Sequence, residues 1–195
     1  MRGQDIVLPI DPQGSRRRTL LQGAGLLSAA TVALLGGRPA LAAGLKATPA
    51  QLEGDARILN TALGAELEAV AAYQVGAESG LLGAGTLKVA QQFQGHHKEH
   101  ADALAAAIAK LGGRPVSPKA GYAFPVDKLR NELDVLRFAA GLERGAVSAY
   151  LGAVPLFADR QLAQVAGSIL ADEAMHWAVL RQALGEVPVP TAFLS

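Results

Sequence analysis

The 195-residue sequence contains no cysteine. Disulfide bonds, thiolate metal sites, iron–sulfur clusters and a lipid anchor on an N-terminal cysteine are therefore excluded. Aromatic residues make up only 5% of the chain, whereas half of its residues are hydrophobic, with alanine and leucine abundant. This composition and length favour one domain of closely packed helices over a β-sandwich.

The sequence also lacks a strong excess of either charge. Its formal net charge is +1, and no basic face with interleaved aromatic residues can be traced along it. Both observations argue against nucleic acid as a partner.

The N-terminal 42 residues have the pattern of an export signal. Residues 15–21 (Ser-Arg-Arg-Arg-Thr-Leu-Leu) precede a short apolar run, and residues 40–42 are Ala-Leu-Ala. A basic segment, an apolar segment and an Ala-x-Ala ending are typical of a signal peptide, and the Ser-Arg-Arg-x-x-Leu-Leu core is similar to a twin-arginine signal. We therefore expect the twin-arginine machinery to export residues 43–195 to the periplasm or another extracytoplasmic space after cleavage.

The alternative for this segment is an uncleaved membrane anchor. Its apolar run spans about 16 residues and is interrupted by Gly and Gln, short of the ~20 apolar residues that a membrane span needs. No stable span is expected after cleavage. Residues 1–42 hold five of the 18 basic and two of the 17 acidic residues, so residues 43–195 keep 13 basic and 15 acidic residues and a formal charge of −2.

The remainder of the chain contains four segments in which apolar residues recur at steps of three and four, the periodicity of an amphipathic helix. Thr48 and Asp127 are candidate N-caps of the first and third segments, and Pro155 is expected to end or kink the third. The tail from Gly185 is expected to be extended and to place Phe193 and Leu194 on the helices. The four helices are predicted over residues 48–79, 86–111, 127–155 and 159–184.

The order of the connections predicts the topology. Residues 112–126 hold three prolines and little periodicity, which indicates an extended connection long enough to run the length of a bundle. The two halves also repeat, because Glu and Tyr stand seven residues apart in both the first and the third segment (Glu66 and Tyr73, Glu143 and Tyr150). We predict an all-α, antiparallel four-helix bundle made of two helical hairpins joined by a long crossover.

Ionisable residues interrupt each apolar stripe near its middle. Glu173 and His176 are three apart and project from the same helix face, where a buried carboxylate and imidazole need a partner. Carboxylate and imidazole together suit iron, manganese, zinc or copper. A metal-free Glu–His network and a structural layer that fixes helix register are the alternatives. The candidate ligands are Glu66, His97, His100, Glu143, Glu173 and His176.

Residues near this layer have other interpretations. His96, Glu99 and Asp172 lie off the stripes and are expected to face solvent, although His96 and His100 form an alternative ligand pair at i, i+4. Tyr73 and Tyr150 lie ~10.5 Å along the helix from their glutamates. They are either core residues or hydrogen-bond donors to a ligand across the bundle.

The pattern resembles the ferritin-like superfamily over essentially all of residues 43–195, and most closely the small exported, desiccation-related type. The resemblance implies a ferritin-like bundle with a metal site. In it, Glu66 and Glu143 match the single glutamates of helices one and three, and His100 matches the histidine of helix two. Glu173 and His176 match the Glu-x-x-His of helix four.

The sequence departs from this pattern at His97, where the usual di-iron proteins have a glutamate. We expect a dinuclear iron or manganese site, while His97 leaves a single metal, zinc or copper open. The resemblance implies oxidase, peroxidase or catalase activity on oxygen or peroxide, with no catalytic residue assigned. A non-catalytic metal-binding or stress-protection protein of the envelope is the alternative, and a homo-oligomer is left open.

Overall fold

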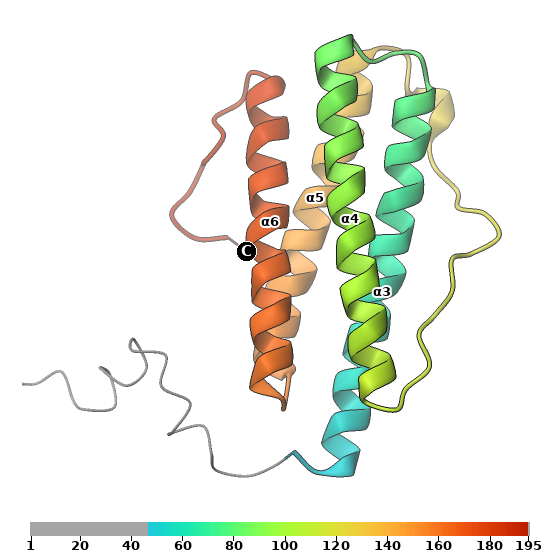
Figure 1. The fold of residues 1–195 in the computed structure, drawn as a ribbon. Coiled ribbons are helices and arrows are strands. Elements are labelled where there is room, and N and C mark those ends of the chain that lie inside the picture. The colour runs from blue at the N-terminus through green and yellow to red at the C-terminus, as the bar shows by residue number, and fades with distance from the viewer. Residues whose placement is uncertain (1–46, 195) are drawn as a thin grey trace, which may run out of the picture. The chain divides into compact units, whose positions relative to one another are not determined.

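The computed structural model describes residues 47–194, so the expected signal peptide lies outside the described residues. Within that range, four long helices form a bundle (Figure 1). The predicted all-α architecture is confirmed. The elements are α3 (Pro49–Glu78), α4 (Ala84–Lys110), η3 (Val126–Lys128), α5 (Glu132–Ala153), η4 (Val154–Leu156) and α6 (Arg160–Ala183).

The helices pair as two hairpins, since α3 packs mainly against α4 and α5 mainly against α6. The connection between α4 and α5 runs from one end of the bundle to the other (Figure 1). Asn60 on α3 holds this crossover in place. Its amide nitrogen donates to the Arg114 carbonyl at 3.0 Å, and its Oδ1 accepts from the Val116 N–H at 2.8 Å.

The helix starts follow from local capping. Thr48 caps α3 in a capping box with Gln51, as the sequence predicts. The prediction that Asp127 caps the third helix is wrong, because Asp127 lies in η3 and Leu129 then adopts an extended conformation. Asn131 caps α5 instead, and its side chain accepts a hydrogen bond from the Asp134 N–H at 3.0 Å.

The end of the third long helix was predicted correctly, whereas the position of the C-terminal tail was not. α5 ends at Ala153, and Pro155 lies in the single 3₁₀ turn η4 that follows it. The expectation that Phe193 packs on the bundle is wrong, since its side chain is 89% exposed. The start of the tail is held by Arg181, which donates to the Val187 carbonyl at 2.8 Å.

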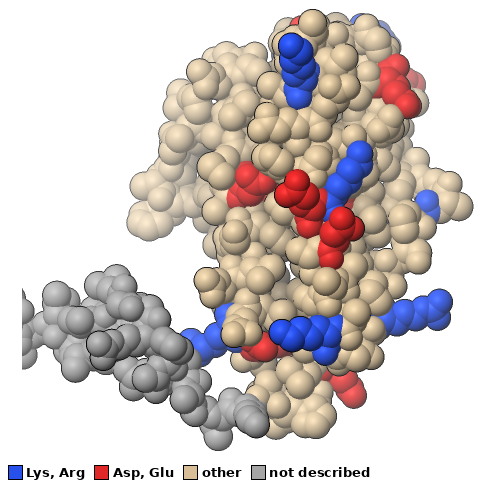
Figure 2. Space-filling model, viewed as in Figure 1, with Lys and Arg blue, Asp and Glu red and all other residues tan. Residues whose placement is uncertain are grey.

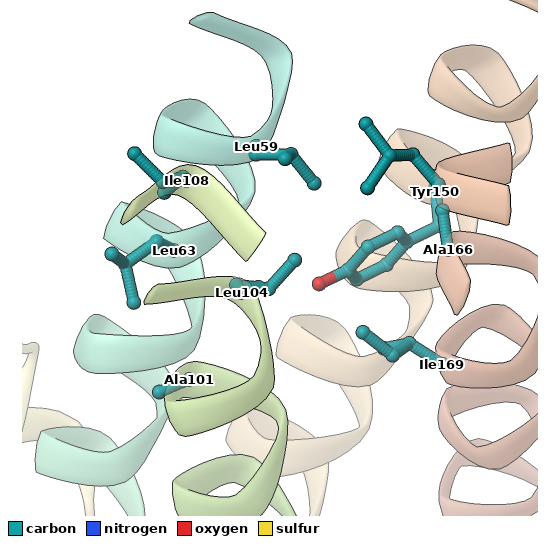
Figure 3. Packing of buried hydrophobic residues seen from close by; sticks show 9 residues of the cluster. Leu59, Leu63, Ala101, Leu104, Ile108, Tyr150, Ala166 and Ile169 are labelled. Atoms are coloured by element: carbon teal, nitrogen blue, oxygen red, sulfur yellow. The ribbon is translucent and has the colours of Figure 1, made fainter. Parts of the chain in front are cut away.

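Two apolar clusters fill the bundle interior. The first includes Leu59, Leu104, Ile108 and Ile169, with the ring of Tyr150 reaching in from α5 (Figure 3). The second is built from Tyr73, Phe93, Leu136, Ala140 and Leu180. Along each helix, the candidate ligands lie between a member of one cluster and a member of the other. The polar layer is therefore sealed by apolar packing on both sides.

The surface carries few charges on the face shown in Figure 2, where acidic side chains gather at mid-height over α4 and α6. This is the level at which the candidate ligands lie along the helices. Among the described residues, no helix is both long enough and apolar enough to cross a membrane.

Candidate metal centre

The structure brings the six predicted ligands into one layer at the middle of the bundle. Five of them are at most 2% exposed, and His100 is largely buried, with a side chain that is 14% exposed. Each lies on the inward face of its helix, because the steps of three and four that place apolar residues inside also place these polar ones there. The layer therefore follows directly from helix periodicity.

The six residues form two overlapping groups of four. In each group, one ligand atom per residue lies within 4.8 Å of the others. His97 and Glu173 belong to both groups, so they lie between the two positions at which an ion could be held. The groups are Glu66, His97, His100 and Glu173, and His97, Glu143, Glu173 and His176.

Five buried polar atoms in this layer make no hydrogen bond of good geometry, although they face one another at ion-pair distances of 3.0–3.6 Å. Burying such atoms without a partner costs about 1–3 kcal/mol each, so five in one layer require an explanation. All five are imidazole nitrogens or carboxylate oxygens, the atoms that bind divalent transition metals. A cation within the layer would satisfy them together, and the residues present therefore fit a metal ion. The atoms are His100 Nδ1, His176 Nδ1, Glu143 Oε2 and both carboxylate oxygens of Glu173.

His97 occupies a different position from the other two histidines. Its Nδ1 lies 2.8 Å from Glu66 Oε2 and its Nε2 lies 3.3 Å from Glu143 Oε1. Burial disfavours the charged imidazole, but the hydrogen bonds to Glu143 and Glu66 outweigh it and raise the pKa of His97 to about 10. In the metal-free protein, His97 thus provides a positive charge between these two glutamates.

The two tyrosines link the halves of the chain. Tyr150 on α5 donates to Glu66 Oε1 on α3 at 2.6 Å, and Tyr73 on α3 donates to Glu143 Oε1 on α5. Burial and the facing carboxylate raise the pKa of both tyrosines, so both hydroxyls keep their protons. The sequence left two roles open for the tyrosines, core residues or hydrogen-bond donors to a ligand. In the structure they fill both, because their hydroxyls donate to candidate ligands and their rings pack in the core.

Glu66 and Glu143 remain ionised despite their burial. Burial raises the pKa of Glu66, but the imidazoles of His100, 3.6 Å away, and His97, 2.8 Å away, outweigh this effect and lower the pKa below its ordinary value. The pKa of Glu143 is likewise raised by burial and lowered further by the nearby imidazoles of His176, 3.6 Å away, and His97, 3.3 Å away. Both carboxylates are thus available as anionic ligands at neutral pH.

Two residues near the site were not expected to face it. Asp172 is half-buried, and its Oδ2 lies 3.2 Å from His176 Nε2 and 3.4 Å from His100 Nε2. His96 is also half-buried, with its Nδ1 3.1 Å from Asp172 Oδ2. The internal repeat contains a signal for both, because His96 and Asp172 occupy equivalent positions in the two halves. Glu99 is exposed, as expected.

The metal-free protein is expected to lose stability as the pH rises above neutral. Carboxylate contacts outweigh burial and raise the pKa of His100 and His176 to about 9, and that of His97 to about 10. A group that binds its proton more tightly in the folded protein than in the unfolded chain adds to stability. That contribution is complete below the unfolded-state pKa of ~6.5 and is lost as the pH rises through the folded-state pKa.

Thermal unfolding of the protein in chelator at several pH values between 6 and 10 measures this effect. The midpoint should fall by roughly 2–4 °C for each kcal/mol lost. Metal-loaded protein should not show the same fall, because a metal ion binds the unprotonated imidazole. If the midpoint in chelator stays constant or increases as the pH is raised above 7, the ion pairs between these histidines and the glutamates are contradicted.

Comparison with known proteins places the site in a family context. The chain matches the family model described as a ferritin-like domain over residues 54–186. No curated protein matches the chain.

Solved structures share the fold at low sequence identity. A conserved hypothetical protein from Mycobacterium tuberculosis is 21% identical, with a TM-score of 0.64 over 73% of this chain and 99% of its own. A ferritin-like, diiron-carboxylate protein from Bacillus anthracis is 20% identical, with a TM-score of 0.59 over 69% of this chain and 97% of its own. A mycobacterial bacterioferritin is 20% identical, with a TM-score of 0.56 over 72% and 86%. With a bundle of this topology and a buried Glu/His cluster at its centre, the chain belongs to the ferritin-like domain family.

Proposed function

We propose that this chain is an exported metal-binding protein whose Glu/His layer holds two iron or manganese ions and reacts with oxygen or peroxide. The observation that supports the proposal best is the set of five unpartnered imidazole and carboxylate atoms in one buried layer. Three glutamates supply the oxygen ligands that iron and manganese favour. A structural neighbour from Bacillus anthracis is described as a diiron-carboxylate protein, which favours iron.

The protein's own part in this chemistry is to hold the ligands in a layer that is largely shielded from solvent. A bound redox-active ion would supply the electrons that reduce oxygen or peroxide. The Tyr150 hydroxyl keeps its proton on the bond to Glu66 Oε1, and the Tyr73 hydroxyl does the same for Glu143. These bonds fix the carboxylate orientations before any ion arrives.

A cavity of about 360 Å³ adjoins the layer, and we expect small molecules to reach the layer through it. It lies between α3 and α5, and alanines and glycine make up much of its wall. Glu66, His97 and Tyr150 line it, so oxygen or peroxide entering from this side would meet the candidate ligands directly.

Metal binding without turnover is the second candidate, and His97 favours it. Both of its ring nitrogens contact carboxylates, at 2.8 and 3.3 Å. An imidazole in that arrangement replaces a carboxylate that could bridge two ions. A single ion held for structure or storage would suit such a site.

Elemental analysis of protein recovered from its native export route tests the proposal. We expect about two iron or manganese ions per chain, as in other carboxylate-bridged bundles, and consumption of peroxide or oxygen by the loaded protein. Sequencing the N-terminus of the same sample should find a start just after Ala42. One zinc or copper ion without turnover would favour the second candidate, and a preparation without metal would overturn both.

A further inference from the structure

Three side chains form a separate cluster at the outer edge of the polar layer, on the side formed by α4 and α6. His96 Nδ1 lies 2.9 Å from His176 Nε2 and 3.1 Å from Asp172 Oδ2, and His176 Nε2 lies 3.2 Å from the same oxygen. The three atoms make a closed triangle. His96 and Asp172 are partly exposed, with side-chain exposures of 34% and 24%, whereas His176 is buried.

Hydrogen bonds cannot satisfy all three sides of this triangle. Each ring nitrogen carries either a hydrogen or a lone pair, never both, so each imidazole serves as donor or acceptor at that atom. If both nitrogens donate to Asp172, two N–H groups face each other at 2.9 Å. If one imidazole donates to the other, the acceptor presents its lone pair to the carboxylate at over 3 Å. One side is unfavourable in every case.

A cation between the three atoms removes this conflict. We propose that His96 Nδ1, Asp172 Oδ2 and His176 Nε2 form an outer site for one divalent transition-metal ion, best suited to zinc. Zinc binds nitrogen and oxygen ligands at about 2.0–2.1 Å in a tetrahedron, which places ligand atoms ~3.3 Å apart. The observed separations of 2.9–3.2 Å need only a small expansion to reach that value.

The donor set distinguishes this outer site from the inner layer. Two imidazoles and one carboxylate form a donor set that holds zinc or ferrous iron, whereas the inner layer has three carboxylates beside its imidazoles and is richer in oxygen ligands. Three protein ligands leave a fourth position for water, which the partial exposure of His96 and Asp172 permits.

The rings are held in position by packing. Phe93 stacks on His176 with ring centroids 3.9 Å apart, and the His96 ring is stacked on the same imidazole at 5.1 Å. Asp172 and His176 are one helical turn apart on α6, and His96 faces them from α4. Both elements are long helices, so little ordering is needed when an ion binds.

The outer site shares His176 with the inner layer, and its Nδ1 faces Glu143 and Glu173, each at 3.6 Å. Because a neutral imidazole has one unprotonated nitrogen, His176 binds an ion on one side at a time. The outer site is therefore expected to fill when the inner layer is empty. The inference stands apart from the proposed function, since it needs no ion in the inner layer.

Replacing all three inner carboxylates isolates the outer site. In the full-length Glu66→Gln, Glu143→Gln, Glu173→Gln protein, equilibrium dialysis against zinc ions followed by elemental analysis should find about one zinc per chain. Adding His96→Ala or Asp172→Asn should reduce this to about none. Adding Glu99→Gln, which alters an exposed carboxylate of α4, should leave it unchanged.

Either of two results would overturn the outer site, namely no zinc in the triple variant, or zinc retained after His96→Ala. Should the triple variant not fold, Glu173→Gln alone serves as the background, because Glu173 belongs to both inner groups. There, His96→Ala should lower the zinc content by about one ion per chain, and an unchanged content would contradict the inference. Failure of the proposed function would appear differently, as wild-type protein whose inner layer takes up no iron or manganese.

Discussion

Protein carrying Glu143→Gln and Glu173→Gln is expected to lose essentially all of its iron or manganese. The change removes two of the three carboxylates of the inner layer and three of its five unpartnered atoms. What remains is one carboxylate among imidazoles, which is too few anionic oxygen ligands to hold two iron or manganese ions. Because glutamine has nearly the same shape as glutamate, the apolar clusters on either side should stay packed.

Elemental analysis of variant and wild type, purified side by side, measures the effect. The fall should be from about two ions per chain to about none. Glu99→Gln is the matched control, since Glu99 is an exposed glutamate of α4, and it should keep the wild-type content. Equal iron or manganese in the double variant and the wild type would show that the layer is not their site.

Asp55→Ala should cause the largest loss of stability among single changes that leave the metal layer intact. The Asp55 side chain is 1% exposed, and its two oxygens accept from the backbone N–H groups of Ala158 and Asp159, both at 2.9 Å. It thereby fastens the first turns of α3 to the segment that starts α6. Alanine would leave both N–H groups without this partner, at a cost of about 1–3 kcal/mol each.

Thermal unfolding of the metal-free protein measures this cost. Two such groups give a loss of about 2–6 kcal/mol, which should lower the midpoint by roughly 4–24 °C. Glu53→Ala removes an exposed carboxylate from the same helix, and its midpoint should stay close to that of the wild type. An Asp55→Ala midpoint equal to that of Glu53→Ala would mean that water replaces the lost bonds.

The parts of the structure that could be predicted are those fixed by helix periodicity. Glu66, Glu143 and Glu173 interrupt apolar stripes, and a stripe faces the core whichever helix it packs against. The hairpin–crossover–hairpin topology followed because short turns leave little choice of neighbour and residues 112–126 had to span the bundle.

The predictions that were wrong or absent concern residues whose position depends on contacts between helices or on the conformation of a connecting segment. Asp127 and Asn131 are both good N-caps, and the extended conformation of Leu129 decided between them. Asp172 lies off its stripe but reaches the layer because α4 runs beside α6 at that height. Asp55 lies on the buried face of α3, four residues before Leu59, but its partners are 103 and 104 residues away and could not be read from the helix pattern.

The crossed tyrosine bonds make each half of the chain complete the other. Glu66 on α3 accepts its hydrogen bond from the tyrosine hydroxyl of α5, 84 residues later in the chain. Glu143 on α5 accepts its hydrogen bond from the tyrosine hydroxyl of α3, 70 residues earlier. Neither hairpin alone holds a finished ligand set. Capture of a metal ion is therefore a sign that both hairpins have docked, and a chain stalled halfway through folding would offer an ion only loosely oriented carboxylates.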